Sequence, residues 1–141
     1  MEIRDAVESD AEAMAAIADA PTDVMRNLIH DRTVRVAVSE ERSTDPNDDT
    51  GDSFQDLLGL VSFDARSETV HVTQLDGTTD ACRQLLGEPI RFARQEGMSV
   101  ELLVPEPDDE IASAADQVGF DRLGRGPQFA GQPTVRFRLE P

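Results

Sequence analysis

The sequence lacks lysine, tryptophan and tyrosine altogether, and it has a single cysteine, Cys82, among 141 residues. One cysteine excludes an intrachain disulfide and a metal site built from cysteines. The apolar runs are a few residues long, whereas a membrane-spanning helix needs about 20 residues. The first residues, MEIRDAVESDAEAM, have no basic region followed by an apolar segment, which argues against a signal peptide. We therefore expect one cytoplasmic domain over residues 1–141, with no membrane partner and no metal.

Acidic residues dominate the charged residues of the chain. The chain carries 29 acidic residues against 13 basic ones, for a net charge of −16, and every basic residue is arginine. Such a chain repels itself at ordinary salt, but at about 1 M salt the Debye length falls to roughly 3 Å and screens the repulsion. The composition therefore resembles that of proteins from salt-accumulating archaea; the alternative is an acidic mimic of nucleic acid. The lack of a basic face excludes DNA or RNA as a partner.

Apolar residues recur at helical or strand spacing along most of the chain. The expected order is strand, helix, helix, strand, strand, strand, helix, strand, helix, strand, strand. This order favours an α/β fold with a mixed central sheet. The expected strands are at 1–7, 33–39, 57–63, 69–75, 98–105, 120–123 and 134–139, and the expected helices at 9–20, 22–31, 81–97 and 107–120.

Three local features refine these elements. Ser9 and Glu12 have the spacing of a capping box, which predicts a helix start. Pro89 is expected to kink the third helix or divide it in two, and Gly97 is expected to end it. The segment LLGLVSF, residues 57–63, is apolar nearly throughout, which is typical of a strand buried on both faces.

The polar segment at residues 40–53 has no periodicity and is expected to be a loop. Its residues Asp45, Asn47 and Asp49 resemble those of a calcium-binding loop, but the glycine comes one place late and Asp56 replaces the final Glu. We interpret the segment as a solvated loop between two strands.

The order of elements and three segments resemble the GCN5-related N-acetyltransferase (GNAT) family. MEIRDAVESDAEAMAAIAD resembles the family's opening strand and acidic helix. Leu85–Val104 resembles the helix and strand that flank the acetyl-coenzyme A (acetyl-CoA) site, and Ala114–Gly124 resembles the late helix with its Gly-Phe pair. The resemblance covers essentially the whole chain. It implies an acetyl-CoA-dependent N-acyltransferase that acts on a small-molecule or peptide amine.

The resemblance also implies a cofactor site where the strand at 69–75 turns into the third helix. In the family, successive backbone amides at this turn bind the pyrophosphate of coenzyme A, and the preceding strand holds its pantetheine. The cofactor-binding residues implied here are Val72, Thr73, Gln74, Gly77, Thr78, Thr79, Asp80, Ala81, Cys82 and Arg83.

This turn departs from the family's signature, which is an Arg or Gln, two residues, and then Gly-x-Gly or Gly-x-Ala. Gly77 falls at the Arg/Gln position, and Asp80 and Cys82 fall at the two small-residue positions, so the chain resembles a degenerate member. A carboxylate beside a diphosphate costs on the order of several kcal/mol unless it is screened. The alternative interpretation is that Thr79 or Asp80 simply caps the helix.

His71 is the candidate catalytic residue, because the resemblance places its strand beside the acetyl group and the amine. An imidazole titrates at about pH 6.5 and is able to deprotonate an incoming ammonium. The alternative is a half-exposed strand histidine without chemistry. Ala115 sits where many family members carry a Tyr that protonates the leaving thiolate. Cys82 is interpreted as a packing residue rather than a nucleophile.

Two functions stay open at this point. The first is the acyltransferase, and the second is a binding or interaction module of the same fold that has lost its acetyl-CoA chemistry. The glycine- and proline-rich segment GRGPQFAGQP, residues 124–133, is expected to be a loop on the substrate side or at a homodimer contact.

Overall fold

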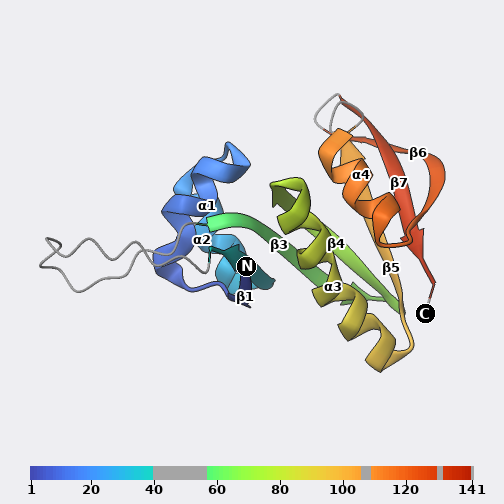
Figure 1. Ribbon diagram of the computed structural model, residues 1–141, viewed down its shortest axis with the longest axis horizontal. Coiled ribbons are helices and arrows are strands. Elements are labelled where there is room, and N and C mark those ends of the chain that lie inside the picture. The colour runs from blue at the N-terminus through green and yellow to red at the C-terminus, as the bar shows by residue number, and fades with distance from the viewer. Residues whose placement is uncertain (40–56, 106–108, 130–131, 141) are drawn as a thin grey trace, which may run out of the picture.

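The computed structural model describes residues 1–39, 57–105, 109–129 and 132–140. The loop expected at 40–53, with its calcium-like residues Asp45, Asn47 and Asp49, lies outside these ranges. The described elements, in chain order (Figure 1), are β1 (Glu2–Asp5), η1 (Glu8–Asp10), α1 (Ala11–Ala18), α2 (Thr22–Asp31), β2 (Thr33–Val38), β3 (Leu57–Arg66), β4 (Thr69–Gly77), α3 (Thr79–Glu96), β5 (Ser99–Pro105), α4 (Asp109–Gln117), β6 (Asp121–Phe129) and β7 (Gln132–Leu139).

The order of strands and helices confirms the prediction from the sequence, with the short 3-10 helix η1 as an addition. The strands form a seven-stranded sheet in the order β1-β2-β3-β4-β5-β7-β6. β4 and β5 are parallel, because α3 carries the chain back between them, and the other neighbouring pairs are antiparallel. The α/β class with a mixed sheet is therefore confirmed.

Helices cover the two faces of the sheet unequally (Figure 1). On one face, α1 and α2 pack against β2 and β3 around Val36 and Leu60. On the other face, α3 and α4 pack against a longer row of strands that includes Val61, Phe63 and Phe137. β3 supplies side chains to both clusters, which confirms that LLGLVSF is a strand buried on both faces.

The predicted capping box at Ser9 and Glu12 is wrong. Ser9 lies inside η1, and α1 begins after Asp10 without a side-chain cap. The Asp10 carboxylate is instead buried, where it accepts hydrogen bonds from the Val7 N–H at 2.8 Å and from Arg4 at 2.7 and 2.9 Å. A charged pair with several hydrogen bonds outweighs the weaker hydroxyl cap, so the chain turns one residue later than the pattern predicts.

Pro89 was expected to kink the third helix or divide it in two; it does not divide the helix, because α3 runs without interruption from Thr79 to Glu96. Pro89 removes one backbone N–H from the helix, but Leu86 and Ile90 on either side of it are buried against the sheet. This packing stabilises the helix enough to keep it continuous. The predicted end is confirmed, since Gly97 adopts a left-handed φ of 68°.

The glycine- and proline-rich segment after Leu123 is mostly strand rather than loop. β6 extends to Phe129, although the sequence predicted its end at Leu123. Among the described strands, β6 lies at the edge of the sheet next to β7, with register shifts in this pair between Arg122 and Gly124 and between Gly126 and Phe129. An edge strand with bulges tolerates the residues that a central strand excludes.

Candidate functional site

The two parallel strands in the middle of the sheet separate after a short stretch of pairing. β4 and β5 pair at four positions, from Thr69 with Ser99 to Val72 with Leu102. β4 then continues to Gly77 without a described partner on this side, while β5 continues to Pro105 paired only with β7. Figure 1 shows the two strands together at one end and apart at the other. Backbone N–H and C=O groups on the facing edges are therefore not bonded to each other.

β4 carries a bulge at the position where it leaves β5. Ser62 of β3 pairs with Gln74 and Phe63 pairs with Val72, so Thr73 is an extra residue without a counterpart. The buried Ser62 hydroxyl and the Thr73 hydroxyl are hydrogen-bonded at 2.6 Å. A bulge bends a strand and increases its local twist. The bulge thus lies where β4 must bend away from its parallel neighbour.

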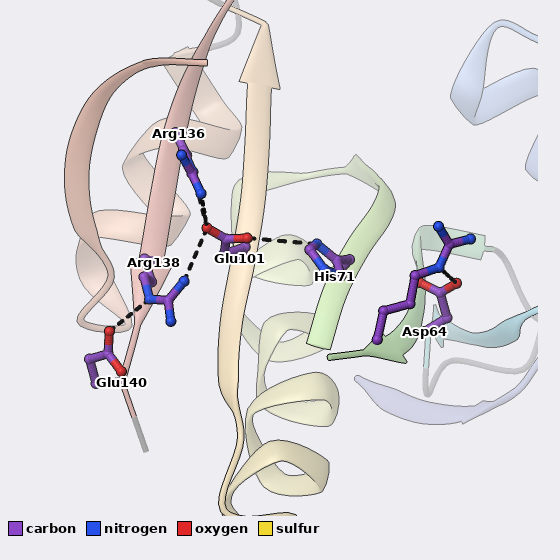
Figure 2. A network of polar contacts seen from close by, with 7 residues as sticks. Asp64, His71, Glu101, Arg136, Arg138 and Glu140 are labelled. Atoms are coloured by element: carbon purple, nitrogen blue, oxygen red, sulfur yellow. Dashed lines mark hydrogen bonds and ion pairs between the residues drawn. The ribbon is translucent and has the colours of Figure 1, made fainter. Parts of the chain in front are cut away.

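His71 lies two residues before this bulge, on the face of the sheet opposite α3. Strand pairing places it between two carboxylates, with Asp64 of β3 on one side and Glu101 of β5 on the other. Its Nδ1 atom is 3.7 Å from Glu101 Oε2, and its side chain is 41% exposed (Figure 2). Val70 and Val72 face the core instead, as the alternation predicted. His71 is therefore half exposed, and a carboxylate faces one of its two ring nitrogens.

Two arginines of β7 converge on the same glutamate. Glu101 Oε1 accepts hydrogen bonds from Arg136 at 2.6 and 3.0 Å and from Arg138 at 3.2 Å (Figure 2). Burial raises the pKa of Glu101, but the hydrogen bonds and charges of the two arginines outweigh burial and lower it overall. Arg138 also donates to Glu140 at 2.7 Å. Glu101 is thus held as a carboxylate that faces His71.

The surface around these charges is otherwise sparsely covered. Leu103 of β5 is 40% exposed on the same face. In β6, Gly124 pairs with Arg136 and Gly126 pairs with Thr134, so neither position adds a side chain over the arginine. A Cβ atom at Gly126 would lie 2.7 Å from Thr134 Oγ1 and 2.8 Å from Leu103 Cδ2. A side chain at this position would have to displace the ends of these two side chains. We name His71, Glu101, Leu103, Arg136 and Arg138 the open face.

The turn before α3 is a capped helix start. The Thr78 side chain accepts a hydrogen bond from the Ala81 N–H at 3.1 Å, so Thr78 is the cap rather than Thr79 or Asp80. The Thr78 N–H donates to Leu58 and the Cys82 N–H to the Thr78 carbonyl. Three of the five amides from Thr78 to Cys82 are therefore occupied. Among the described residues, the N–H groups of Thr79 and Asp80 have no acceptor.

Gly77 has a steric role at this turn. Its φ is 135°, and a Cβ atom there would lie 2.4 Å from the Leu58 carbonyl oxygen and 2.5 Å from Gly59 Cα. No other residue fits where β4 approaches β3 so closely. The glycine is explained by this contact between backbones, whether or not a phosphate binds nearby.

Asp80, which opposes an anion at this turn, has a cationic partner. Arg83 lies one helical turn further on and donates to the Asp80 carboxylate at 2.9 Å and to Gln117 of α4 at 2.9 Å. Both ions of the pair are substantially exposed, with side chains 71% and 43% accessible for Asp80 and Arg83. The arginine therefore offsets the negative charge at the second position of the helix.

The remaining predicted residues have packing roles. Ala81, Cys82 and Ala115 are fully buried in the cluster beneath α3 and α4, which supports the packing interpretation of Cys82. The described residues contain no group of metal-binding side chains and no helix long and apolar enough to cross a membrane. A cavity of about 740 Å³ lies along the outside of α3 and is lined by Arg83, Arg91 and Arg94, away from His71.

The structure thus brings His71, Val72, Thr73 and Gln74 to the separation of the strands, and Thr78 to Arg83 to the helix start. The sequence did not predict that Glu101, Arg136 and Arg138 join His71. The signal was present in the alternation of VELLV and VRFR, which turns these charged residues away from the core. Which strands became neighbours depended on the topology of the sheet.

Comparison with known proteins gives structural matches only. No protein-family model matches the sequence, and no curated protein does. Arabidopsis thaliana NAA60, solved in complex with a bisubstrate analogue, superposes with a TM-score of 0.76 at 15% identity, covering 99% of this chain and 97% of that one. Ribosomal-protein-alanine N-acetyltransferase from Brucella melitensis gives 0.71 at 16% identity, covering 99% of each chain.

A protein of Desulfovibrio desulfuricans assigned to the GNAT family of acetyltransferases gives a TM-score of 0.70 at 15% identity, covering 99% of this chain and 98% of that one. At such identities the likeness concerns the fold alone. The chain has the fold of the GNAT acetyltransferases over nearly its whole length.

Proposed function

We propose that the protein is an N-acyltransferase that transfers the acetyl group of acetyl-CoA to an amine. The observation that carries the proposal is the separation of β4 and β5 at the Thr73 bulge, two residues from His71. The separation leaves strand edges available to a ligand in the middle of the sheet, where open α/β sheets form their binding crevices. That it occurs within the fold of acetyltransferases supports acyl transfer rather than another chemistry.

The residues at the separation fit an elongated ligand with a polar end. The backbone of Val72 to Gln74 would bind the pantetheine chain through the edge groups that β5 does not use. The Thr79 and Asp80 amides at the positive end of the α3 dipole would bind the diphosphate, with Arg83 adding a cation. The bound thioester would supply an activated acetyl group, whose carbon leaves sulfur and bonds to the amine nitrogen.

His71 would accept the proton that the amine loses. Its Nδ1 faces the Glu101 carboxylate, so Nε2 is the nitrogen that is left for the substrate. Glu101 would position the ring and stabilise the imidazolium that forms, as a carboxylate does for a general base. The chain has no tyrosine to protonate the leaving thiolate, so water would supply that proton.

Thermal unfolding in about 1 M KCl tests the binding step. Acetyl-CoA at about 100 times its Kd adds roughly 2.7 kcal/mol to the free energy of unfolding and is expected to raise Tm by several degrees. ATP at the same concentration controls for a general effect of anions. If millimolar acetyl-CoA leaves Tm unchanged, the acyltransferase proposal fails.

Replacement of the two histidines tests the catalytic step. His71→Ala is expected to lower kcat about 100-fold, the lower range for loss of a general base. His30→Ala is the matched control, because His30 is an exposed histidine of α2 whose side chain is 59% accessible. Equal turnover in the two variants would remove His71 as the base.

A second candidate function is a binding module without acetyl-CoA chemistry. It is favoured by the occupied amides at the helix start and by the exposed carboxylate of Asp80. The same titration separates the two functions, because a module that has lost the cofactor gives no change in Tm at any acetyl-CoA concentration.

We further infer a salt-rich cytoplasm as the setting of the protein. The excess of acidic over basic residues, 29 against 13, supports this, since molar salt screens their repulsion. The free energy of unfolding is then expected to rise between 0.1 and about 2 M KCl. A flat or falling dependence would contradict the inference.

A further inference from the structure

The open face concentrates arginine in a protein that is short of cations. Arg136 and Arg138 lie next to each other on β7, and their side chains are 46% and 31% exposed. The whole chain has a net charge of −16. Where salt does not screen it, the overall field attracts an ammonium group and repels an anion. Arg136 and Arg138 are cations, so beside the candidate base they repel an ammonium group locally and favour an anionic group of a ligand.

Neither guanidinium is fully used by the carboxylates that hold it. Arg136 contacts Glu101 through Nε and Nη2, and Arg138 contacts Glu140 through Nε and Glu101 through Nη1. Within the described part of the chain, Arg136 Nη1 and Arg138 Nη2 have no acceptor. Gly124 on β6 leaves the Arg136 side without a covering side chain. The arginines are thus fixed at one edge and available for bonding at another.

Glu101 also sets the distance between the arginines and His71. Its Oε2 atom is 3.7 Å from His71 Nδ1, and its Oε1 atom is 2.6 Å from Arg136 Nη2. One carboxyl group therefore bridges the base and the guanidinium. A ligand whose amine binds at His71 would place its own carboxylate at Arg136 only if a few bonds separate its nitrogen from that carboxylate. Arginine prefers planar carboxylates, which it binds through two parallel hydrogen bonds.

We propose that the acceptor is a primary amine that carries a carboxylate a few bonds from its nitrogen, and that Arg136 binds this carboxylate with help from Arg138. The proposal rests on the acyltransferase function and adds the class of its acceptor. Arg136 determines specificity, while His71 accepts the proton. Leu103 is exposed on the same face and lies beside Gly126.

Matched acceptors test the proposal. Thiol release from acetyl-CoA is measured with glycine, β-alanine and γ-aminobutyrate, and with the amide of each. At least one acid is expected to exceed its amide in kcat/KM about tenfold or more, because a charge-assisted hydrogen bond is lost with the carboxylate. Arg136→Gln is expected to remove this preference, so that each acid and its amide have the same kcat/KM. A peptide with Glu at its second position, compared with Gln, distinguishes a peptide acceptor from a free amino acid.

Arg26→Gln is the control variant, because Arg26 on α2 is 45% exposed, as Arg136 is, and lies away from the open face. It is expected to keep the preference for acids. The proposal would be overturned if acids and amides have equal kcat/KM, or if Arg136→Gln lowers kcat/KM by the same factor for both. Neither result would contradict acetyl-CoA binding.

A readout without acetyl-CoA separates this proposal from the proposed function. The Arg136 Nε–H, which is bonded to Glu101, gives a side-chain ¹⁵N signal that Arg136→Gln identifies by its loss. Titration with N-acetyl-β-alanine is expected to shift this signal, and N-acetyl-β-alanine amide is expected to leave it in place. Equal shifts with both compounds would overturn carboxylate binding, whatever the outcome for acetyl-CoA.

Discussion

Strands β1 to β3 and strands β5 to β7 belong to one sheet, but helices cover the first group on both faces and the second group on one (Figure 1). In the first group, Leu60 packs under α1 and α2 and Val61 packs under α3. In the second group, Leu102 and Phe137 pack under α3 and α4, while Glu101 and Arg136 face away from them.

The difference shows how one sheet serves both stability and ligand binding. Apolar side chains on both faces fix the first group, whereas charged side chains replace them on one face of the second. β4 lies between the groups, and its bulge coincides with the change. The candidate site is therefore located where the double cover ends. The predictions that follow test this contrast, from the largest expected effect to the smallest.

Replacement of Phe137 by alanine is expected to have the largest effect. Its ring is fully buried beneath the helices and lies 5.2 Å from the Arg122 guanidinium. Loss of the ring should lower the free energy of unfolding by about 3–5 kcal/mol. Leu103→Ala, on the opposite face of the neighbouring strand, should cost less than about 1 kcal/mol. Urea unfolding measures both, and equal losses would show that the open face is covered.

Replacement of Gly77 by alanine tests the close approach of the β4 and β3 backbones, at the end of the group of strands that helices cover on both faces. The methyl group would meet the Leu58 carbonyl and Gly59, and φ would stay positive. The expected loss is about 2–4 kcal/mol. Gly87→Ala, on α3 with open space around it, should instead gain about 0.5–1 kcal/mol. A neutral Gly77→Ala would refute the steric explanation of this glycine.

Replacement of Glu101 by glutamine is expected to have the smallest effect and a defined pH dependence. The pKa of Glu101 is lowered in the folded protein, because the hydrogen bonds and charges of Arg136 and Arg138 outweigh the effect of burial. Its stabilisation is therefore present above the unfolded pKa, near 4.3, and is lost as pH falls through the folded pKa.

The difference between wild type and Glu101→Gln should be about 1 kcal/mol at pH 7 and shrink below about pH 4. Chemical unfolding across this range measures it. A difference that is constant from pH 7 to pH 3 would contradict a stabilising role for the ionised carboxylate.

The sequence predicted most of the fold because local patterns determine the elements. Alternation located β2 and β7, and periodicity located α3, since burial on one face repeats with the period of each structure. It missed the start of α1, where Asp10 binds Arg4, and the length of β6, where edge pairing tolerates Gly126. Both errors arise where contacts between segments outweigh local preference.

The candidate site was predicted less completely for the same reason. His71 and the start of α3 were found from residue type and the resemblance, whereas Glu101 and the arginines became neighbours only through the order β4-β5-β7. The bulge has no signal in residue type, because Thr73 is an ordinary strand residue. Its position follows from the pairing of Ser62 with Gln74 and of Phe63 with Val72 between β3 and β4.

The bulge at Thr73 also determines how β4 tolerates changes of length. Before it, the even-numbered residues Val70 and Val72 face α3, and after it the odd-numbered Leu75 does. Deletion of Thr73 would bring the two segments into one regular alternation and keep Leu75 toward α3. Loss of the bulge with Thr73 retained would instead turn Leu75 to the opposite face, with Asp76 toward the helix. β4 therefore consists of two segments, joined at Thr73, in which residues of opposite parity face α3. A sequence alignment that misplaces a single gap here would assign every later side chain of β4 to the wrong face.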